Sequence, residues 1–134
     1  MGKKTSSWEN VPEDINEHLG FVYIITHIPS GKYYIGKKQF FNKTKYPPLK
    51  GRKNKRIRWV ESDWETYTGS SNKFNKFVEK EGIHSFRKEM LAFADSKFDL
   101  SYKELLFQLS HDVLNDINSY NEIINVRLRK AKKH

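Results

Sequence analysis

The chain has 134 residues and carries 25 Lys and Arg against 16 Asp and Glu, a formal net charge of +9. This length predicts one domain, and the absence of cysteine excludes disulfides, thiolate metal ligands and a thiol nucleophile. No apolar run approaches the roughly 20 residues of a membrane helix, and the first residues lack the apolar core of a secretory signal. We therefore expect a soluble, cytoplasmic protein with no membrane partner.

The first two elements are a polar N-terminal extension and a hairpin. In residues 1–19, apolar side chains recur at three- and four-residue steps, and Pro12 suits the first turn of a helix, so a short helix is expected. Residues 20–28 and 32–36 are rich in β-branched and aromatic side chains and are separated by Pro-Ser-Gly. This pattern predicts an antiparallel hairpin.

A basic segment follows the hairpin. Residues 37–57 show no apolar periodicity and contain two adjacent prolines, which predicts a long loop. Eight basic residues and no acid lie between Lys43 and Arg58. Such a segment favours a nucleic-acid partner, because each neutralised phosphate releases condensed counterions. The residues expected to bind DNA are Lys37, Lys50, Arg52, Lys53, Lys55 and Arg56.

Helices and one strand are expected in the second half of the chain. Residues 58–67 predict a short helix, residues 71–81 a second helix, and residues 86–93 a third strand. A capping-box pattern from Ser101 to Glu104 predicts the start of the last helix. The order β-β-α-α-β-α indicates an α+β fold with a small, mostly antiparallel sheet flanked by helices.

The C-terminal tail, residues 127–134, is the second basic segment. It holds five basic residues in eight positions. Binding to a polyanion and an ordinary solvated terminus explain it equally well.

The hairpin also carries two short motifs, Phe-Val-Tyr at residues 21–23 and Tyr-Ile-Gly at residues 34–36. From about residue 20 to 126 the chain resembles the GIY-YIG nuclease family, which is named after two tripeptides on such a hairpin. The second tripeptide is intact, whereas the first keeps only its tyrosine. Residues 61–71 and 120–124 look closest to the phage-encoded, free-standing Seg-type members. The resemblance implies a three-stranded antiparallel sheet flanked by helices.

The resemblance also implies roles for individual side chains. Tyr23 matches the general base, Tyr34 the residue that binds and orients the phosphate, and Glu104 the ligand of one Mg²⁺ or Mn²⁺ ion. A phenol is a poor base at neutral pH, so Lys37, Lys38 or the metal is expected to favour its ionised form. Read from the residues alone, Glu104 could instead complete the capping box.

Three further family residues match less directly. The family's arginine is missing from its usual place shortly after the second tripeptide, so Arg58 is our choice, with Arg56 and Lys38 as alternatives. The histidine that many members carry is replaced by Ser62. Asn121 matches an asparagine that holds the backbone near the active centre, although an ordinary turn would also use asparagine.

Together these features predict a metal-dependent endonuclease for double-stranded DNA, with a phage homing-like or genome-interference role. The basic loop and tail are expected to contact phosphates rather than read sequence. Two alternatives stay open: a basic module that binds nucleic acid without cutting it, and a regulator whose basic tail binds an acidic protein. One active site per chain is compatible with a monomer or a transient dimer.

Overall fold

The centre of the molecule is a four-stranded sheet in the order β1-β6-β2-β3. The computed structural model describes residues 7–124, 128 and 130. Strand β2 (Gly20–His27) pairs antiparallel with both β3 (Tyr33–Gln39) and β6 (Phe86–Ala94). The short strand β1 (Trp8–Glu9) extends the sheet by pairing in parallel with β6. The α+β class and the mostly antiparallel sheet are therefore confirmed.

The predicted hairpin is β2 and β3, joined by a tight turn. In that turn the N–H of Gly31 donates to the carbonyl of His27 at 2.7 Å. Gly31 has a φ of 78°, a conformation that favours glycine because it has no Cβ. The strand and turn signals in the local sequence therefore agree with the observed hairpin.

Both helices have serine caps. Helix α1 (Asn72–Glu81) begins after Ser71 and ends at Gly82, as predicted, and the 3₁₀ helix η2 (Ile83–Ser85) leads from it into β6. Helix α2 (Lys97–Ser110) is capped by the side chain of Ser96, which accepts a hydrogen bond from the N–H of Asp99. The helix therefore starts earlier than predicted, and the expected capping box lies inside it.

The two helices cover opposite faces of the sheet. Neighbouring side chains of a strand point to opposite faces, so adjacent residues of β2 pack against different helices. Tyr23 of β2 packs in one core cluster with Phe74 of α1. Val22 packs in a second cluster with Leu100 of α2. Strand β2 is consequently enclosed from both sides.

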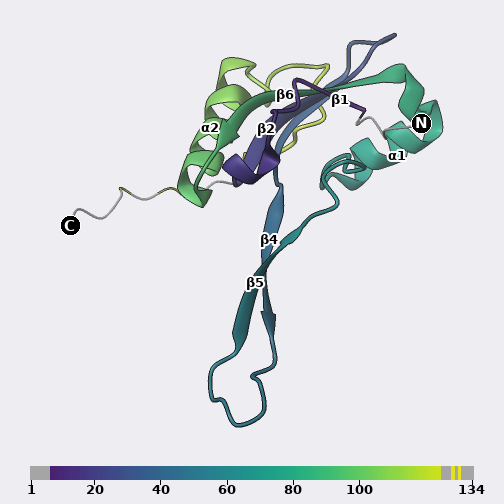
Figure 1. Ribbon diagram of the computed structural model, residues 1–134. Helices are drawn as coiled ribbons and strands as arrows, with labels where there is room; N and C mark the ends of the chain where they lie inside the picture. The colour runs from purple at the N-terminus through teal and green to yellow at the C-terminus, as the bar shows by residue number, and fades with distance from the viewer. Residues whose placement is uncertain (1–6, 125–127, 129, 131–134) are drawn as a thin grey trace.

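The largest departure from prediction is the segment between β3 and α1. It forms β4 (Phe41–Tyr46) and β5 (Arg56–Glu61), a separate two-stranded antiparallel sheet that extends away from the rest of the molecule (Figure 1). The predicted helix at residues 58–67 is therefore wrong. The predicted loop at residues 37–57 is wrong except for residues 47–55, which connect the two strands.

The physical reason is that this β4–β5 ribbon has no buried face. Trp59 and Val60 suggested the apolar side of a helix, but they are 54% and 42% exposed. A strand whose two faces are both solvated need not alternate polar and apolar residues, so the usual strand signal is missing.

The predicted N-terminal helix is also wrong for residues 7–19, the part of that segment that the structure describes. These residues contain β1 and a 3₁₀ helix, η1 (Ile15–Glu17). Trp8 of β1 is buried in the core and donates its indole N–H to the carbonyl of Trp64 at 2.8 Å. The segment expected to be an extension thus contributes to the main hydrophobic core.

Two predictions concern the ends and surface of the chain. Apart from residues 128 and 130, the basic tail at 127–134 lies outside the described residues. No helix in the described part of the chain combines the length and hydrophobicity needed to cross a membrane.

Candidate active site

Three tyrosines gather on the α1 side of the β2–β3 hairpin, and we call Tyr23, Tyr34 and Tyr67 the tyrosine cluster. The ring centroid of Tyr23 lies 6.4 Å from that of Tyr34 and 6.1 Å from that of Tyr67. A Cβ added to Gly36 would lie 2.5 Å from the Tyr23 hydroxyl, and one added to Gly69 would lie 3.1 Å from it. Glycine at these two positions therefore makes room for the phenol.

Tyr67 is the member of the cluster that the sequence analysis missed. Tyr67 lies within residues 58–67, where the sequence predicts a helix that the structure does not contain. Its neighbour Gly69 has a φ of 102°, which marks a turn rather than a helix. The Tyr-Thr-Gly sequence was the available signal, but nothing in it indicates contact with Tyr23.

Tyr34 lies at the open side of the cluster. Its ring stacks on Phe74 of α1 with centroids 5.6 Å apart, and its hydroxyl is 3.4 Å from the Ser70 hydroxyl. The same ring borders a pocket formed by the N-terminal turn of α1 and residues 120–123. A phosphate in this pocket would meet the hydroxyl groups of Tyr34 and Ser70 and the N-terminus of a helix, which favours anions, beside the ion pair of Lys73 and Glu122.

Glu104 reaches the site from α2. It is the eighth residue of that helix, which excludes the capping-box role. Its side chain is 15% exposed, and Oε1 lies 3.9 Å from Nζ of Lys37, which also donates to the hydroxyl of Ser101 at 2.7 Å. Burial raises the pKa of Glu104, and Lys37 opposes part of that increase. The carboxyl is therefore partly desolvated but not isolated.

Asn121 fixes the backbone of Ile35, the middle residue of the second tripeptide. Its Oδ1 accepts from the N–H of Ile35 at 2.9 Å, and its Nδ2 donates to the carbonyl of Ile35 at 2.8 Å. Gln108 donates to the same carbonyl at 3.2 Å. The amide thereby pairs with the backbone of Ile35 as a neighbouring strand would, and it restrains the positions of Tyr34 and Gly36 on either side.

Residues 4–124 match a protein-family model described as "Putative endonuclease segE, GIY-YIG domain". The chain belongs to this GIY-YIG endonuclease family. The resemblance found in the sequence, including its Seg-type character, is confirmed. A GIY-YIG endonuclease is a hydrolase that acts on nucleic acid. No curated protein and no solved structure matches the chain.

The proposed base of the GIY-YIG site, Tyr23, has a pKa raised well above the ordinary value of 10. Burial is the main cause, followed by the charges of Tyr67, Tyr34 and Glu104. The expected help from lysines is not present in the chain alone, because Lys38 binds Asp63 at 2.6 Å and Lys37 is held at Glu104 and Ser101. Without a further cation the phenol stays protonated at neutral pH.

Of the three candidates for the family's arginine role, Lys38 contacts the tyrosine cluster. Its Nζ lies 4.0 Å from the ring centroid of Tyr67. Arg56 and Arg58 are on β5, where their guanidinium carbons lie 6.0 Å and 5.9 Å from the ring centroid of Tyr46. The structure therefore places the preferred candidate, Arg58, on the ribbon and not at the tyrosines.

The other predicted DNA-binding residues also divide between two places. Lys37 lies beside Glu104 at the site. Four residues lie in the segment that joins β4 to β5, at the far end of the ribbon: Lys50, Arg52, Lys53 and Lys55.

Glu104 is also the expected metal ligand. Within residues 7–124, 128 and 130, no three His, Cys, Asp or Glu side chains are grouped to hold an ion. Mg²⁺ is commonly bound in proteins by one or two carboxylates, with waters and substrate phosphates completing its shell. Glu104 is a single, partly buried carboxylate whose charge acts on Tyr23, and this fits a site of that kind.

Proposed function

We propose that the protein is a metal-dependent endonuclease that hydrolyses phosphodiester bonds in double-stranded DNA. The observation that carries the proposal is that Tyr23 and Tyr34 lie with ring centroids 6.4 Å apart on the β2–β3 hairpin, where the charge of Glu104 also acts on Tyr23. The family resemblance assigns these residues to proton transfer, phosphate binding and metal binding. The net charge of +9 favours a polyanionic substrate.

The chain's own residues have distinct tasks in this reaction. Tyr34 and the nearby Ser70 hydroxyl donate hydrogen bonds to the scissile phosphate. Water attacks phosphorus in line with the leaving oxygen, and the bond between phosphorus and that oxygen breaks. Tyr23, once ionised to the phenolate, accepts the proton of the water, and the leaving oxygen takes a proton from solvent. When bound at Glu104, Mg²⁺ or Mn²⁺ supplies positive charge that offsets the phosphate and lowers the pKa of the nearby phenols.

Lys38 takes the charge-stabilising role that the family gives to arginine. Its ammonium group lies at the ring of Tyr67, and its present partner, Asp63, has a side chain that is 69% exposed. Exchange of this exposed carboxylate for a phosphate would keep the Lys38 ammonium group, whose side chain is only 17% exposed, paired with an anion.

The biological setting follows from the Seg-type resemblance. The enzyme is phage-encoded, acts in the host cytoplasm, and cuts DNA in a homing-like or genome-interference process. Each chain contributes one site, so it cuts one strand as a monomer and both strands through two encounters or a transient dimer.

Cleavage of supercoiled plasmid tests the proposal. The purified protein is incubated with Mg²⁺, with Mn²⁺ and with EDTA, beside Glu104→Ala and the control Glu79→Ala, which removes an exposed carboxylate from α1. We expect nicked or linear product only with metal, and a loss on the order of 1,000-fold in Glu104→Ala alone. Intact plasmid with all proteins, with DNA binding retained, would instead identify a non-catalytic nucleic-acid-binding module.

A further inference from the structure

The length and width of the β4–β5 ribbon fit the major groove of duplex DNA. Six residue pairs join its strands, so it is about 20 Å long at about 3.4 Å per residue. Its two strands lie about 5 Å apart, and the major groove, about 12 Å wide, admits a two-stranded ribbon. The ribbon extends freely from the body (Figure 1). A ribbon of this length spans about six base pairs at 3.4 Å each.

The two faces of the ribbon differ in chemistry. The register pairs Asn42 with Val60, Thr44 with Arg58, and Tyr46 with Arg56. Because side chains alternate along a strand, these six residues share one face, which we call the arginine face. The opposite face, which we call the lysine face, comprises Phe41, Lys43, Lys45, Ile57, Trp59 and Glu61.

The arginine face holds the side-chain types that distinguish base pairs. Arginine pairs with the two acceptors of guanine, asparagine with the donor and acceptor of adenine, and threonine with either. Both guanidinium groups lie about 6 Å from the ring of Tyr46, which restrains them on this face. Arg58, Asn42 and Thr44 thus lie together on one face of the ribbon.

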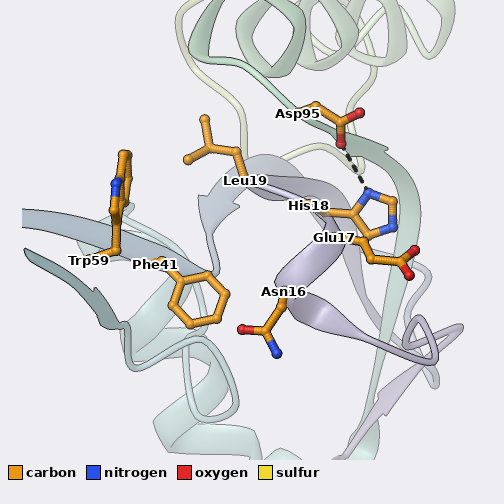
Figure 2. A pocket seen from close by; sticks show the side chains of 7 residues that line it. All are labelled: Asn16, Glu17, His18, Leu19, Phe41, Trp59 and Asp95. Carbon is orange, nitrogen blue, oxygen red and sulfur yellow. Dashed lines mark hydrogen bonds and ion pairs between the residues drawn. The ribbon is translucent and has the colours of Figure 1, made fainter.

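The lysine face is less suited to lie on DNA. Where the ribbon joins the body, Phe41 and Trp59 line a pocket that also contains Glu17 and Asp95 (Figure 2). The figure shows both carboxylates on the body side of this pocket, with Asp95 directed at His18, whose Nδ1 is 3.2 Å away. These acidic groups lie across the pocket from Phe41 and Trp59, and their negative charge would disfavour a phosphate backbone placed over it.

We propose that the β4–β5 ribbon enters the major groove of duplex DNA and reads base edges with its arginine face. Lys43 and Lys45 then point away from the bases, toward the phosphates of the groove walls, and residues 47–55 contact phosphates at the far end. The inference rests on DNA being the substrate. It gives this small nuclease a sequence preference of its own, in contrast to the expectation that its basic segment only positions the backbone.

Two double variants provide a matched test. Arg56→Ala with Arg58→Ala and Lys43→Ala with Lys45→Ala each remove two positive charges from the same ribbon, but from opposite faces. Each variant and the parent protein are used to select duplexes from a random-sequence pool in EDTA, so that binding is measured without cleavage. Melting temperatures verify folding.

The parent and the lysine variant should enrich the same sequence, whereas the arginine variant should lose preference by about 10-fold or more at each base pair it no longer reads. The lysine variant should weaken all sequences alike and reduce the slope of log affinity against log salt by about 2, close to 0.9 for each phosphate contact. These two results separate base reading from charge neutralisation.

The inference would be overturned if the parent enriches no sequence, or if both double variants change the preference equally. These outcomes are distinguishable from failure of the nuclease proposal. If the protein selects a sequence through its arginines but never cuts plasmid, the proposal for the ribbon is supported and the nuclease proposal is contradicted. A protein that cuts without any preference retains the enzyme and loses the ribbon's role.

Discussion

The β4–β5 ribbon lies in the chain between Tyr34 and Tyr67 of the tyrosine cluster, but ribbon and cluster are stabilised in different ways. Tyr23 is 1% exposed, on a strand enclosed by two helices, whereas most side chains of the ribbon are exposed. Packing therefore sets the geometry and proton affinity of the cluster. The ribbon depends on its own backbone pairing, which leaves its side chains available to a partner. In the proposed function, the core holds the reacting side chains, and the ribbon outside the core contacts the DNA.

The first way to test this contrast is Tyr23→Phe, for which we expect the largest effect. The variant keeps the buried ring and removes the hydroxyl, so cleavage should fall roughly 100- to 10,000-fold, the usual contribution of a general acid or base. Tyr33→Phe on the adjacent strand is the control, because its hydroxyl bonds Asp116 instead of facing the cluster. Plasmid cleavage and melting temperature are the measurements, and retention of full activity in Tyr23→Phe would remove this residue from the mechanism.

Two tryptophans sharpen the comparison through stability. Trp64 is 5% exposed and packs against Phe40, whereas Trp59 on the ribbon is 54% exposed. Trp64→Ala should lower the free energy of unfolding by about 3–5 kcal/mol, and Trp59→Ala should change it by no more than about 0.5 kcal/mol. Denaturant unfolding measures both. Equal losses would mean that the ribbon packs on the body more tightly than the structure indicates.

Asn121→Ala tests how the edge strand of the site is held. The variant leaves the N–H of Ile35 without its partner and removes one of two donors to the carbonyl, so stability should fall by about 1–3 kcal/mol. Asn118→Ala, an exposed neighbour in the same segment, is the control. Cleavage should fall as well, because Tyr34 and Gly36 flank Ile35. An Asn121 variant as stable as the control would show that the asparagine is an ordinary turn residue.

The smallest expected effect is the pH dependence contributed by Glu104. Burial raises the pKa of this carboxyl above the value of 4.5 expected in the unfolded chain. Between these two pKa values the folded state binds more protons than the unfolded state, so stability falls as pH rises through that range. Glu104→Gln should reduce this fall in metal-free buffer. Chemical unfolding from pH 4 upward measures it, and identical pH profiles for both proteins would contradict the desolvation of Glu104.

Local signals determined several elements from the sequence. The β2–β3 hairpin, helix α1 and strand β6 each combine a periodic apolar pattern with a turn or cap residue, and all three are confirmed. The tripeptides at residues 21–23 and 34–36, together with the order of elements that follows them, also indicated the family, and the family is confirmed over residues 4–124.

Other features were decided only by tertiary structure. A solvated ribbon has no buried face and so no hydrophobic period, which is why β4 and β5 were read as a loop and a helix. The contact of Tyr67 with Tyr23 and the position of Glu104 beside Lys37 join residues distant in sequence. The sequence by itself therefore determined the hairpin and the family. Only packing between distant segments decided which side chains lie together around Tyr23, that Arg56 and Arg58 lie on the ribbon, and which side chains of the ribbon are exposed.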